Sequence, residues 1–191
     1  HYRAQGLVAA FHPVNRLDRG TSGLMAVAKH AHAHERLQHQ LRTGELARTY
    51  LAVCQGVPVP RRGCVDQPIS RLPGSVLKRQ VCPQGARART HYAVERTGAG
   101  RSLVALRLET GRTHQIRAQF AQAGHPLIGD GKYGRERENK KYGRHGQALY
   151  SYRLEFHFTT DAGPLAGLDG KSFQVEDVDF VSEYFPNYHW K

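Results

Sequence analysis

The chain has 191 residues, of which 39% are hydrophobic and 23% charged, a composition typical of one globular domain and unlike that of a disordered chain. It contains no apolar run near the roughly 20 residues of a membrane-spanning helix and no signal-peptide pattern. The net charge of +12 favours a polyanionic partner, with nucleic acid ahead of an anionic membrane surface, although charge that serves only solubility explains it equally well.

The first distinctive stretch is residues 16–23, Arg-Leu-Asp-Arg-Gly-Thr-Ser-Gly, called the signature loop below. Asp18 stands beside Arg16 and Arg19, and neighbouring positive charges favour its ionised form. Two glycines and two hydroxyls suit a tight turn. An ionised, positioned carboxylate suits a nucleophile and not a general acid. This stretch alone favours the plainer interpretation, a turn with a structural ion pair.

Strand and helix patterns alternate in the first half of the chain. We expect a strand at residues 23–29, an amphipathic helix at 30–41 and a strand at 49–53. Residues 57–85 are rich in proline and glycine and should hold short extended pieces. Residues 55–90 contain seven basic side chains and one acid, so this region is suited to meet phosphates. Strands are expected at 90–95 and 103–108.

A second candidate stretch, residues 109–117, has the sequence Glu-Thr-Gly-Arg-Thr-His-Gln-Ile-Arg. Its glycine turn leads into a predicted helix at 114–123 that ends at Gly124. Arg112, His114 and Arg117 lie near the start of this helix, where arginines can clamp a phosphate or fix a carboxylate. By pattern alone, a solvated basic helix face explains these residues better.

The remaining segments differ in charge. Residues 125–134 read as an ordered turn, and the basic residues 135–145 are equally consistent with an RNA contact and a mobile loop. Residues 150–158 alternate apolar and polar side chains and give the clearest half-buried strand, and a further strand is expected at 173–181. The aromatic tail at Tyr184, Phe185, Tyr188 and Trp190 is expected to pack on the body of the protein. Many strands with few helices indicate an α+β domain around an antiparallel sheet.

Cysteines and histidines give no metal or disulfide pattern. Cys54, Cys64 and Cys82 are odd in number and lack a C-x-x-C spacing, which favours a reducing compartment, and we expect the cytoplasm. His30 and His34 are four residues apart, as helical zinc ligands can be, but no further ligand completes a set. We therefore expect surface histidines and no metal.

Together these stretches resemble the RluA-type family of RNA pseudouridine synthases, over roughly residues 6–158. His12-Pro13 with the signature loop resembles the catalytic signature, and Arg48-Thr49-Tyr50 the basic-x-Tyr motif. Residues 110–117 resemble the third motif, which residues 126–130 and 133–134 continue. Ala148-Leu149 resembles the last apolar motif. Four motifs in the family's order are far more specific than one.

The resemblance implies a pseudouridine synthase fold, a mostly antiparallel mixed sheet with flanking helices and a basic cleft. It also implies conversion of uridine in folded RNA to pseudouridine, in which a C5–C1′ bond replaces the N1–C1′ bond, without a metal or an organic cofactor. Asp18 matches the catalytic aspartate, and Arg117 the arginine that pairs with it. Tyr50 matches the tyrosine that stacks on the target base and is suited to take part in proton removal at C5. Leu149 matches the apolar residue under the base.

The expected partner is structured RNA, ribosomal or transfer, and the chain is expected to act as a monomer. The residues expected to contact RNA share a positive charge or a place in these motifs. They are Arg16, Arg19, Arg48, Arg61, Arg62, Arg71, Lys78, Arg79, Arg112 and His114.

The beginning of the chain departs from the family pattern. Family members usually start with a Lys-Pro-x-Gly strand, and many carry an N-terminal S4 domain, whereas only Gly6 fits that pattern here. We therefore expect residues 1–191 to be a single catalytic domain whose N-terminal part is missing. Two other functions stay open: a non-catalytic RNA-binding module that retains the fold, and a carboxylate glycosidase, which needs a second catalytic acid that the motifs do not offer.

Overall fold

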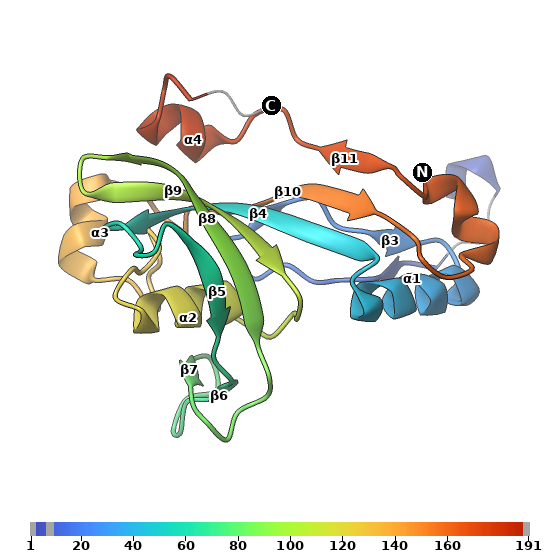
Figure 1. Cartoon of the computed structure of the whole chain (residues 1–191), viewed down its shortest axis with the longest axis horizontal. Coiled ribbons are helices and arrows are strands. Elements are labelled where there is room, and N and C mark those ends of the chain that lie inside the picture. The colour runs from blue at the N-terminus through green and yellow to red at the C-terminus, as the bar shows by residue number, and fades with distance from the viewer. Residues whose placement is uncertain (1–2, 7–9, 189–191) are drawn as a thin grey trace.

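A seven-stranded mixed sheet forms the centre of the molecule in a computed structural model that describes residues 3–6 and 10–188 (Figure 1). The strand order is β11 (Ser172–Gln174), β10 (Leu149–Phe156), β4 (Leu46–Gln55), β9 (Arg101–Leu108), β8 (Arg89–Gly98) and β5 (Arg62–Asp66). Short β2 (Ser22–Gly23) pairs in parallel with β10, and the other pairs are antiparallel. The predicted α+β class with a mostly antiparallel mixed sheet is therefore confirmed.

Helices cover both faces of this sheet. In Figure 1, α1 (Ala31–Thr43) and α2 (Gln115–Gln122) lie below it, α4 (Asp179–Tyr184) lies above it, and α3 (Glu136–Tyr142) lies at one end. A two-stranded sheet of β1 (His12–Pro13) and β3 (Val27–Ala28) contacts α1. Two short 3-10 helices, η1 (Arg3–Gln5) and η2 (Gly163–Leu168), complete the described elements.

Three apolar clusters hold these layers together. Ile116 and Phe120 of α2 pack on Tyr50 and its neighbours in the sheet, and Leu37 of α1 packs on Leu46 of the same strand. On the other face, Phe180, Val181 and Tyr184 of α4 pack on Leu51 and Val53. Because β4 is covered on both faces, all ten of its residues are buried. This explains why it extends beyond the predicted residues 49–53 and buries Arg48 together with the apolar residues.

Strand β10 carries a bulge that the alternating sequence does not reveal. Its register on β4 shifts between Ser151 and Arg153. Before the shift, Tyr150 lies opposite Leu51 and packs in the cluster with α4, but after it Leu154 and Phe156 lie opposite Arg48 and Leu46 and pack in the cluster with α1. The prediction of one half-buried strand is correct. Its apolar residues nevertheless divide between two faces of the sheet.

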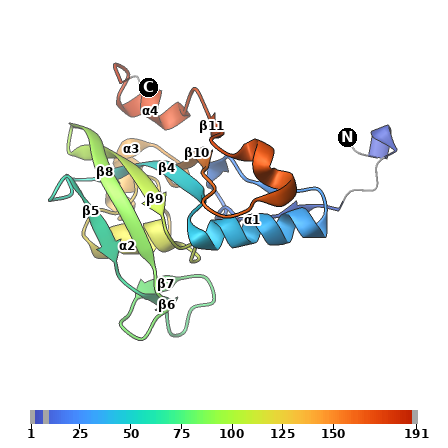
Figure 2. The same cartoon turned by 45° about the vertical axis from the view of Figure 1, so that its right-hand side comes forward.

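Residues 67–88 form an arm that contains the hairpin of β6 (Ile69–Arg71) and β7 (Arg79–Val81). The arm projects from the sheet on the side of α2 (Figures 1 and 2). Its base is anchored by Ile69 and Ala88, which pack on Ala118 of α2 and on Tyr133. Exposed Arg71 and Lys78 lie on it. The predicted short extended pieces at residues 57–85 thus include a projecting basic hairpin.

Two predicted strands are partly wrong. Residues 23–29 divide into β2 and β3, because Gly23 pairs with β10 whereas Val27 pairs with β1. Residues 173–181 contain only the end of β11 before the chain turns into α4. A helix is favoured there because Phe180, Val181 and Tyr184 follow helical spacing and bury one face against the sheet.

Residues 135–145, for which the sequence leaves two interpretations, contain α3. Asn139 of this helix accepts from the backbone N–H of Gly129 at 3.0 Å and donates to the carbonyl of Asp130 at 3.0 Å. Arg144 pairs with Asp179 and Glu183 of α4 at 3.0 and 3.1 Å. The aromatic residues Tyr184, Phe185 and Tyr188 of the tail pack on the body, as predicted, whereas Trp190 lies outside the described residues.

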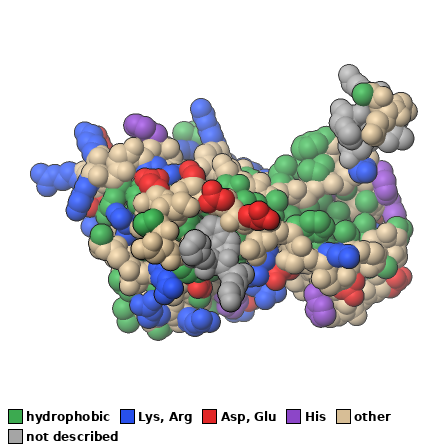
Figure 3. Space-filling view, turned by 90° about the horizontal axis from the view of Figure 1, so that it is seen from above, with side chains coloured by type: hydrophobic (Ala, Val, Ile, Leu, Met, Phe, Trp, Pro, Cys, Tyr) green, Lys and Arg blue, Asp and Glu red, His purple; other side chains and the backbone are tan. Residues whose placement is uncertain are grey.

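The face that carries α4 and β11 differs in charge from the arm. Figure 3 views the molecule from that side and shows acidic side chains across the middle of the face, with Lys and Arg at the end drawn on the left. Residues 155–183 contain seven acids and one lysine. A polyanion is therefore expected to approach from the side of the arm. Among the helices of residues 3–6 and 10–188, none has the length and apolar character needed to cross a bilayer.

Gly23 permits the close pairing of β2 with β10, and this gives a first prediction. A Cβ on Gly23, whose φ is +117°, would lie 2.2 Å from the carbonyl oxygen of Ser151. We expect Gly23→Ala to lower the free energy of unfolding in urea by about 3 kcal/mol or more, from backbone strain and steric overlap together. The control is Gly44→Ala, where φ is +84° and no atom lies within 4 Å of the new Cβ. Equal losses in the two variants would contradict this role of Gly23.

Candidate active site

A cavity of about 490 Å³ lies between β4, the signature loop, the end of α1 and residues 108–115. Its size is within the range of ligand pockets. It brings together residues that are distant in the sequence. Six of the predicted site residues line it: Arg16, Asp18, Arg48, Tyr50, Arg112 and Leu149.

The signature loop is held by backbone contacts to the sheet and by one glutamine. The N–H of Leu24 donates to the carbonyl of Ser151 in β10 at 2.7 Å. The Gln147 side-chain amide donates to the carbonyl of Arg19 at 2.9 Å and to the Thr21 hydroxyl at 3.1 Å. The N–H of Thr21 in turn donates to the carbonyl of Asp18 at 2.9 Å. These bonds fix the turn from which the Asp18 carboxylate, 15% exposed, faces the cavity.

The cationic partner of Asp18 is Arg117 and neither of its sequence neighbours. The two side chains approach to 3.7 Å between Nη1 and Oδ2. Within residues 3–6 and 10–188, neither Arg16 nor Arg19 forms an ion pair with Asp18, and both are exposed. The expectation that the flanking arginines supply the local positive charge is therefore corrected. The predicted pairing of Arg117 with Asp18 is what the structure contains.

Arg117 is held more tightly by a second acid that sequence reasoning did not single out. Asp130, fully buried, accepts from Nε of Arg117 at 2.7 Å and from Nη2 at 2.8 Å. Such a bidentate pair fixes the guanidinium plane as well as its position. Asp130 also accepts from the backbone N–H groups of Lys132 and Tyr133 at 2.9 and 3.1 Å. Asp130 thus aims Arg117 at Asp18.

These contacts determine the charge states of the buried pair. Burial alone would raise the pKa of Asp130, but the hydrogen bonds and charge of Arg117 and the two backbone N–H groups outweigh it and hold that pKa below its ordinary value. Burial likewise opposes the charge of Arg117, but Asp130 and then Asp18 raise its pKa. Both groups are therefore ionised at neutral pH, and Asp18 faces a permanent positive charge.

Tyr50 and Leu149 belong to the apolar part of the cavity wall. Both belong to one cluster with Ile116 and Phe120 of α2, and both are almost fully buried. Burial raises the pKa of the Tyr50 phenol, and nearby Arg48 only partly opposes this. The phenol is therefore protonated at neutral pH, which suits stacking and hydrogen bonding better than it suits a resident tyrosinate base.

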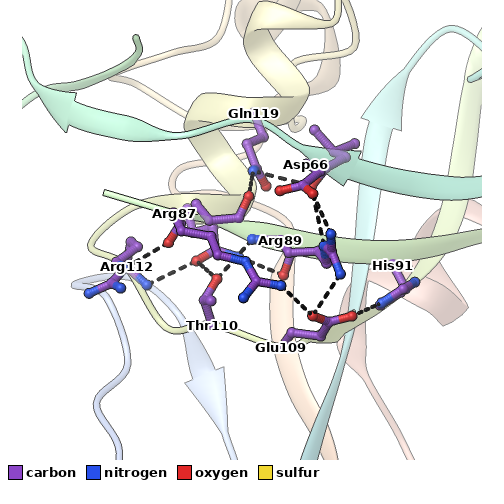
Figure 4. Close-up of polar contacts among 11 residues, drawn as sticks. Asp66, Arg87, Arg89, His91, Glu109, Thr110, Arg112 and Gln119 are labelled. Carbon is purple, nitrogen blue, oxygen red and sulfur yellow. Dashed lines mark hydrogen bonds and ion pairs between the residues drawn. The ribbon is translucent and has the colours of Figure 1, made fainter. Parts of the chain in front are cut away.

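A polar network holds the loop that begins at Glu109 (Figure 4). Arg89 contacts Asp66 at 2.5 Å and Glu109 at 3.4 Å, and Glu109 also contacts Nε2 of His91 at 2.5 Å. The side chain of Arg112 donates through Nε to the carbonyl of Arg87 at 3.0 Å. These bonds connect the base of the arm to the rim of the cavity.

Glutamine side chains continue this network inside the protein. Gln115 accepts from the Thr110 hydroxyl at 2.8 Å and from the N–H of Arg112 at 3.0 Å, and donates to the carbonyl of Arg89 at 3.0 Å. Gln119 donates to the carbonyl of Ala88 at 2.9 Å, near the end of the arm. Helix α2 therefore fixes the cavity rim and the arm relative to each other.

Tyr133 connects the arm to Arg117. Its hydroxyl accepts from the backbone N–H of Arg79 in β7 at 2.7 Å and lies 2.8 Å from Nδ1 of His114. Its ring lies under the Arg117 guanidinium, with 5.2 Å between the Arg117 Cζ atom and the ring centroid. Burial is the main factor that lowers the pKa of His114. A neutral imidazole can accept a hydrogen bond at Nδ1 from the Tyr133 hydroxyl. His114 is buried and adopts a left-handed backbone with φ of 56° at the start of α2, a position that supports the site and does not favour RNA contact.

The other predicted RNA contacts lie outside the cavity. Arg71, Lys78 and Arg79 lie on the arm. Arg61 and Arg62 are exposed at the end of edge strand β5 that is farther from the arm. The structure therefore divides most of the predicted RNA contacts into a cavity group, an arm group and an edge group, whereas Arg19 is exposed on the signature loop and His114 is buried beside Tyr133. Asp130, Tyr133 and Gln115 lie in the third motif and its continuation, but the sequence analysis assigns none of them a role in building the site.

The sequence from the beginning of the chain to α2 matches a family model described as RNA pseudouridylate synthase, over residues 2–122. The chain belongs to the RNA pseudouridylate synthase family. It is 47% identical over 156 residues to "Uncharacterized RNA pseudouridine synthase YjbO" of Bacillus subtilis (strain 168), and this match covers 82% of the chain and 54% of that protein. It is 46% identical over 121 residues to "Ribosomal large subunit pseudouridine synthase D" of Escherichia coli (strain K12), covering 63% of the chain and 37% of that protein.

Solved structures agree with the family assignment. "Human RNA Pseudouridylate Synthase Domain Containing 4" superposes with a TM-score of 0.65 at 26% identity, covering 81% of this chain and 70% of the human chain. "Human RNA Pseudouridylate Synthase Domain Containing 1", at 22% identity and a TM-score of 0.68, shares the fold over 94% of this chain and 82% of its own. By contrast, the chain spans about half the length of the curated bacterial relative from Bacillus subtilis. In the part of the chain that the structure describes, no group of three or more His, Cys, Asp or Glu residues is arranged to hold a metal ion.

The Arg117–Asp130 pair gives the second prediction. Asp130→Asn would leave a buried guanidinium without its charged partner, and we expect a loss of about 3–5 kcal/mol in the free energy of unfolding at pH 7. The measurement is urea unfolding followed by circular dichroism. Asp18→Asn is the control, because its 3.7 Å contact is longer and its carboxylate partly exposed, so its loss should stay below about 1 kcal/mol. Similar losses in both variants would contradict the dominance of Asp130.

The same pair predicts a pH dependence. The pKa of Asp130 is lower in the folded protein than its ordinary 3.8, so its stabilising effect is complete above that value and is lost as the pH falls below it. The stability difference between wild type and Asp130→Asn should stay constant above about pH 5 and shrink as the pH falls below 3.8. Unfolding measured from pH 7 to pH 3 tests this. A difference that grows on acidification would reverse the sign and contradict the assignment.

Proposed function

We propose that the protein isomerises uridine to pseudouridine in structured RNA. The observation that carries the proposal is the placement of Asp18, a carboxylate at the wall of a cavity, 3.7 Å from a buried arginine that a second acid holds in place. Tyr50 and Leu149 supply an apolar surface for a base in the same cavity. Membership of the RNA pseudouridylate synthase family supports this assignment.

Each residue has a distinct part in the proposed reaction. The N1–C1′ bond breaks, a C5–C1′ bond forms, and the proton on C5 is lost. Asp18 acts at the sugar, either by attack on C1′ or by removing a proton on the way to a glycal, and both routes begin with the ionised carboxylate. Arg117 orients Asp18 through the 3.7 Å contact between Nη1 and Oδ2. Leu149 and Tyr50 pack against the uracil. The C5 proton passes to solvent water, and the Tyr50 phenol, protonated because burial raises its pKa, takes part by hydrogen bonding to that water.

The shape of the protein supports an RNA substrate. A uridine must leave its stack to reach a cavity of this kind, and the surrounding RNA must be held while it does so. The arm offers Arg71, Lys78 and Arg79 for this purpose, and the network on α2 fixes the arm relative to the cavity. One relative is named as an enzyme of the large ribosomal subunit. We propose ribosomal or transfer RNA as the substrate, acted on in the cytoplasm by a monomer.

The cavity opposes the alternative of a carboxylate glycosidase. Among the residues that line it, Glu109 is the acid other than Asp18. A glycosidase needs a protonated general acid, whose pKa is raised. Hydrogen bonding from His91 and the charges of Arg89 and Arg87 instead hold the pKa of Glu109 below its ordinary value. Glu109 is therefore suited to structural ion pairing and not to proton donation.

The third prediction is that wild type releases tritium from RNA in which uridine is labelled at C5. Transcripts of ribosomal and transfer RNA would be the substrates, and we expect Asp18→Asn to lower the rate by at least about 10⁴-fold, since it removes the reacting carboxylate. Glu176→Gln makes the same chemical change at an exposed acid far along the chain and should leave the rate unchanged.

Two outcomes would contradict the proposed function. Equal turnover by wild type and Asp18→Asn would remove Asp18 from the reaction. RNA binding by both proteins without tritium release, in this chain and in one extended at its N-terminus, would favour the non-catalytic RNA-binding module.

A further inference from the structure

Arg48 is a buried cation without a partner among the residues that the structure describes. It lies in the central strand β4 and is only 5% exposed. Across residues 3–6 and 10–188, no carboxylate lies within 4.0 Å of its guanidinium and no acceptor receives a hydrogen bond from it, and its buried Nε has no partner. Arg117, at 3% exposure beside the same cavity, has two acids. The two arginines are thus almost equally buried, but Arg117 has two carboxylate partners and Arg48 has none among the described residues.

An unpartnered buried charge is costly for a folded protein. Removing a guanidinium from water costs free energy unless an opposite charge or hydrogen bonds compensate. Burial lowers the pKa of Arg48, which reflects the same cost. Since Arg48 lines the cavity, a ligand that enters the cavity can supply the missing acceptors.

The chain leaves space beside this guanidinium. A Cβ on Gly111 would lie 3.1 Å from Nη1 of Arg48 and 3.3 Å from Nη2. The backbone of Gly111 does not have a positive φ, so its conformation does not itself require glycine. The missing side chain instead lets the Gly111 backbone lie close to the guanidinium, whereas a methyl group at this position would crowd Nη1 and Nη2 at the wall of the cavity.

The charges around Arg48 favour an anion. Arg16, Arg42 and Arg112 line the same cavity. Of the two acids there, Asp18 faces Arg117, and Glu109 is engaged by Arg87, Arg89 and His91. The cavity near Arg48 therefore has an excess of positive charge, which raises the local concentration of an anionic group.

We propose that Arg48 binds the non-bridging oxygens of one backbone phosphate of the RNA, at or next to the uridine in the cavity. This inference rests on the proposed function. A phosphate carries a permanent negative charge and matches the forked donors of arginine. The oxygens of uracil accept hydrogen bonds but become anionic only while the glycosidic bond is broken, so in the bound ground state they compensate the buried charge less than a phosphate does.

Arg48→Met gives the fourth prediction, because methionine is unbranched and apolar and fills a similar space. We expect kcat/KM for tritium release to fall about 10- to 100-fold, the effect of losing hydrogen bonds to a charged group. The slope of log(kcat/KM) against log[salt], measured between 50 and 300 mM KCl, should become shallower by about 0.7–0.9, the contribution of one phosphate contact. The thermal midpoint should stay equal to that of wild type or rise, because a buried unpaired charge has been removed.

Arg48→Lys is the matched control. It keeps the charge, so the salt slope should equal that of wild type, whereas kcat/KM should fall because the two parallel donors are lost. If Arg48→Met lowers kcat/KM with an unchanged salt slope, Arg48 contacts the base or sugar and the phosphate assignment is overturned. If Arg48→Met lowers the thermal midpoint and Arg48→Lys restores it, Arg48 is structural, which also overturns the assignment.

Gly111→Ala supplies an independent test through a double-mutant cycle. Alone, it should reduce kcat/KM about tenfold or more, because its methyl group occupies the space beside Nη1 and Nη2. In the Arg48→Met background it should have little further effect. If the two substitutions reduced kcat/KM additively, Arg48 and Gly111 would not belong to one phosphate-binding site.

The controls also separate this inference from the proposed function. Absence of tritium release from wild type would count against isomerisation itself. Turnover by wild type with an unchanged salt slope in Arg48→Met would count against the phosphate contact alone.

Discussion

The buried pair of Arg117 and Asp130 is the interaction on which the candidate site depends. It places a fixed positive charge beside Asp18, whose sequence neighbours Arg16 and Arg19 form no ion pair with it in the described part of the chain. The pair also joins four segments. Arg117 comes from α2, Asp130 from the following turn that α3 holds through Asn139, Asp18 from the signature loop, and Tyr133 stacks under the guanidinium. The geometry of the carboxylate is therefore set by tertiary contacts and not by its own loop.

Two buried arginines give the cavity an electrostatic division. The charge of Arg117 is compensated by Asp130 and Asp18. Arg117 can therefore orient Asp18 without itself binding an anionic ligand. Arg48 has no compensation among the described residues, and its cost to the free protein is recovered only when an anion binds. Tyr50 lies between these two environments, two residues from Arg48 and in the field of Asp18. A nucleotide that reaches both ends of the cavity would be oriented by charge as well as by stacking.

The sequence predicts much of this architecture because local patterns are strong in most elements. The helices at α1 and α2 and the central strands follow from apolar periodicity, and the motifs identify Asp18, Tyr50, Arg117 and Leu149 as one group. Arg117 and Asp130 lie in one motif and its continuation, but their ion pair depends on tertiary packing that the sequence does not reveal. Strand β4 is longer than predicted because burial on both faces removes the alternation. The prediction of a strand at 173–181 is only partly correct, because packing of Phe180 and Val181 on the sheet selects a helix there.

The bulge in β10 restricts the number of residues that this strand can contain. One extra residue between Ser151 and Arg153 lets the same strand place Leu149 on the cavity face, Tyr150 and Tyr152 against α4, and Leu154 with Phe156 against α1. Deleting that residue would restore regular pairing and, with the later half held in place, would exchange the faces of Leu149 and Tyr150. Insertions and deletions should therefore be excluded from residues 149–153 in functional relatives. The segment between β10 and β11 lies beyond the bulge, so its length does not set which face Leu149 occupies.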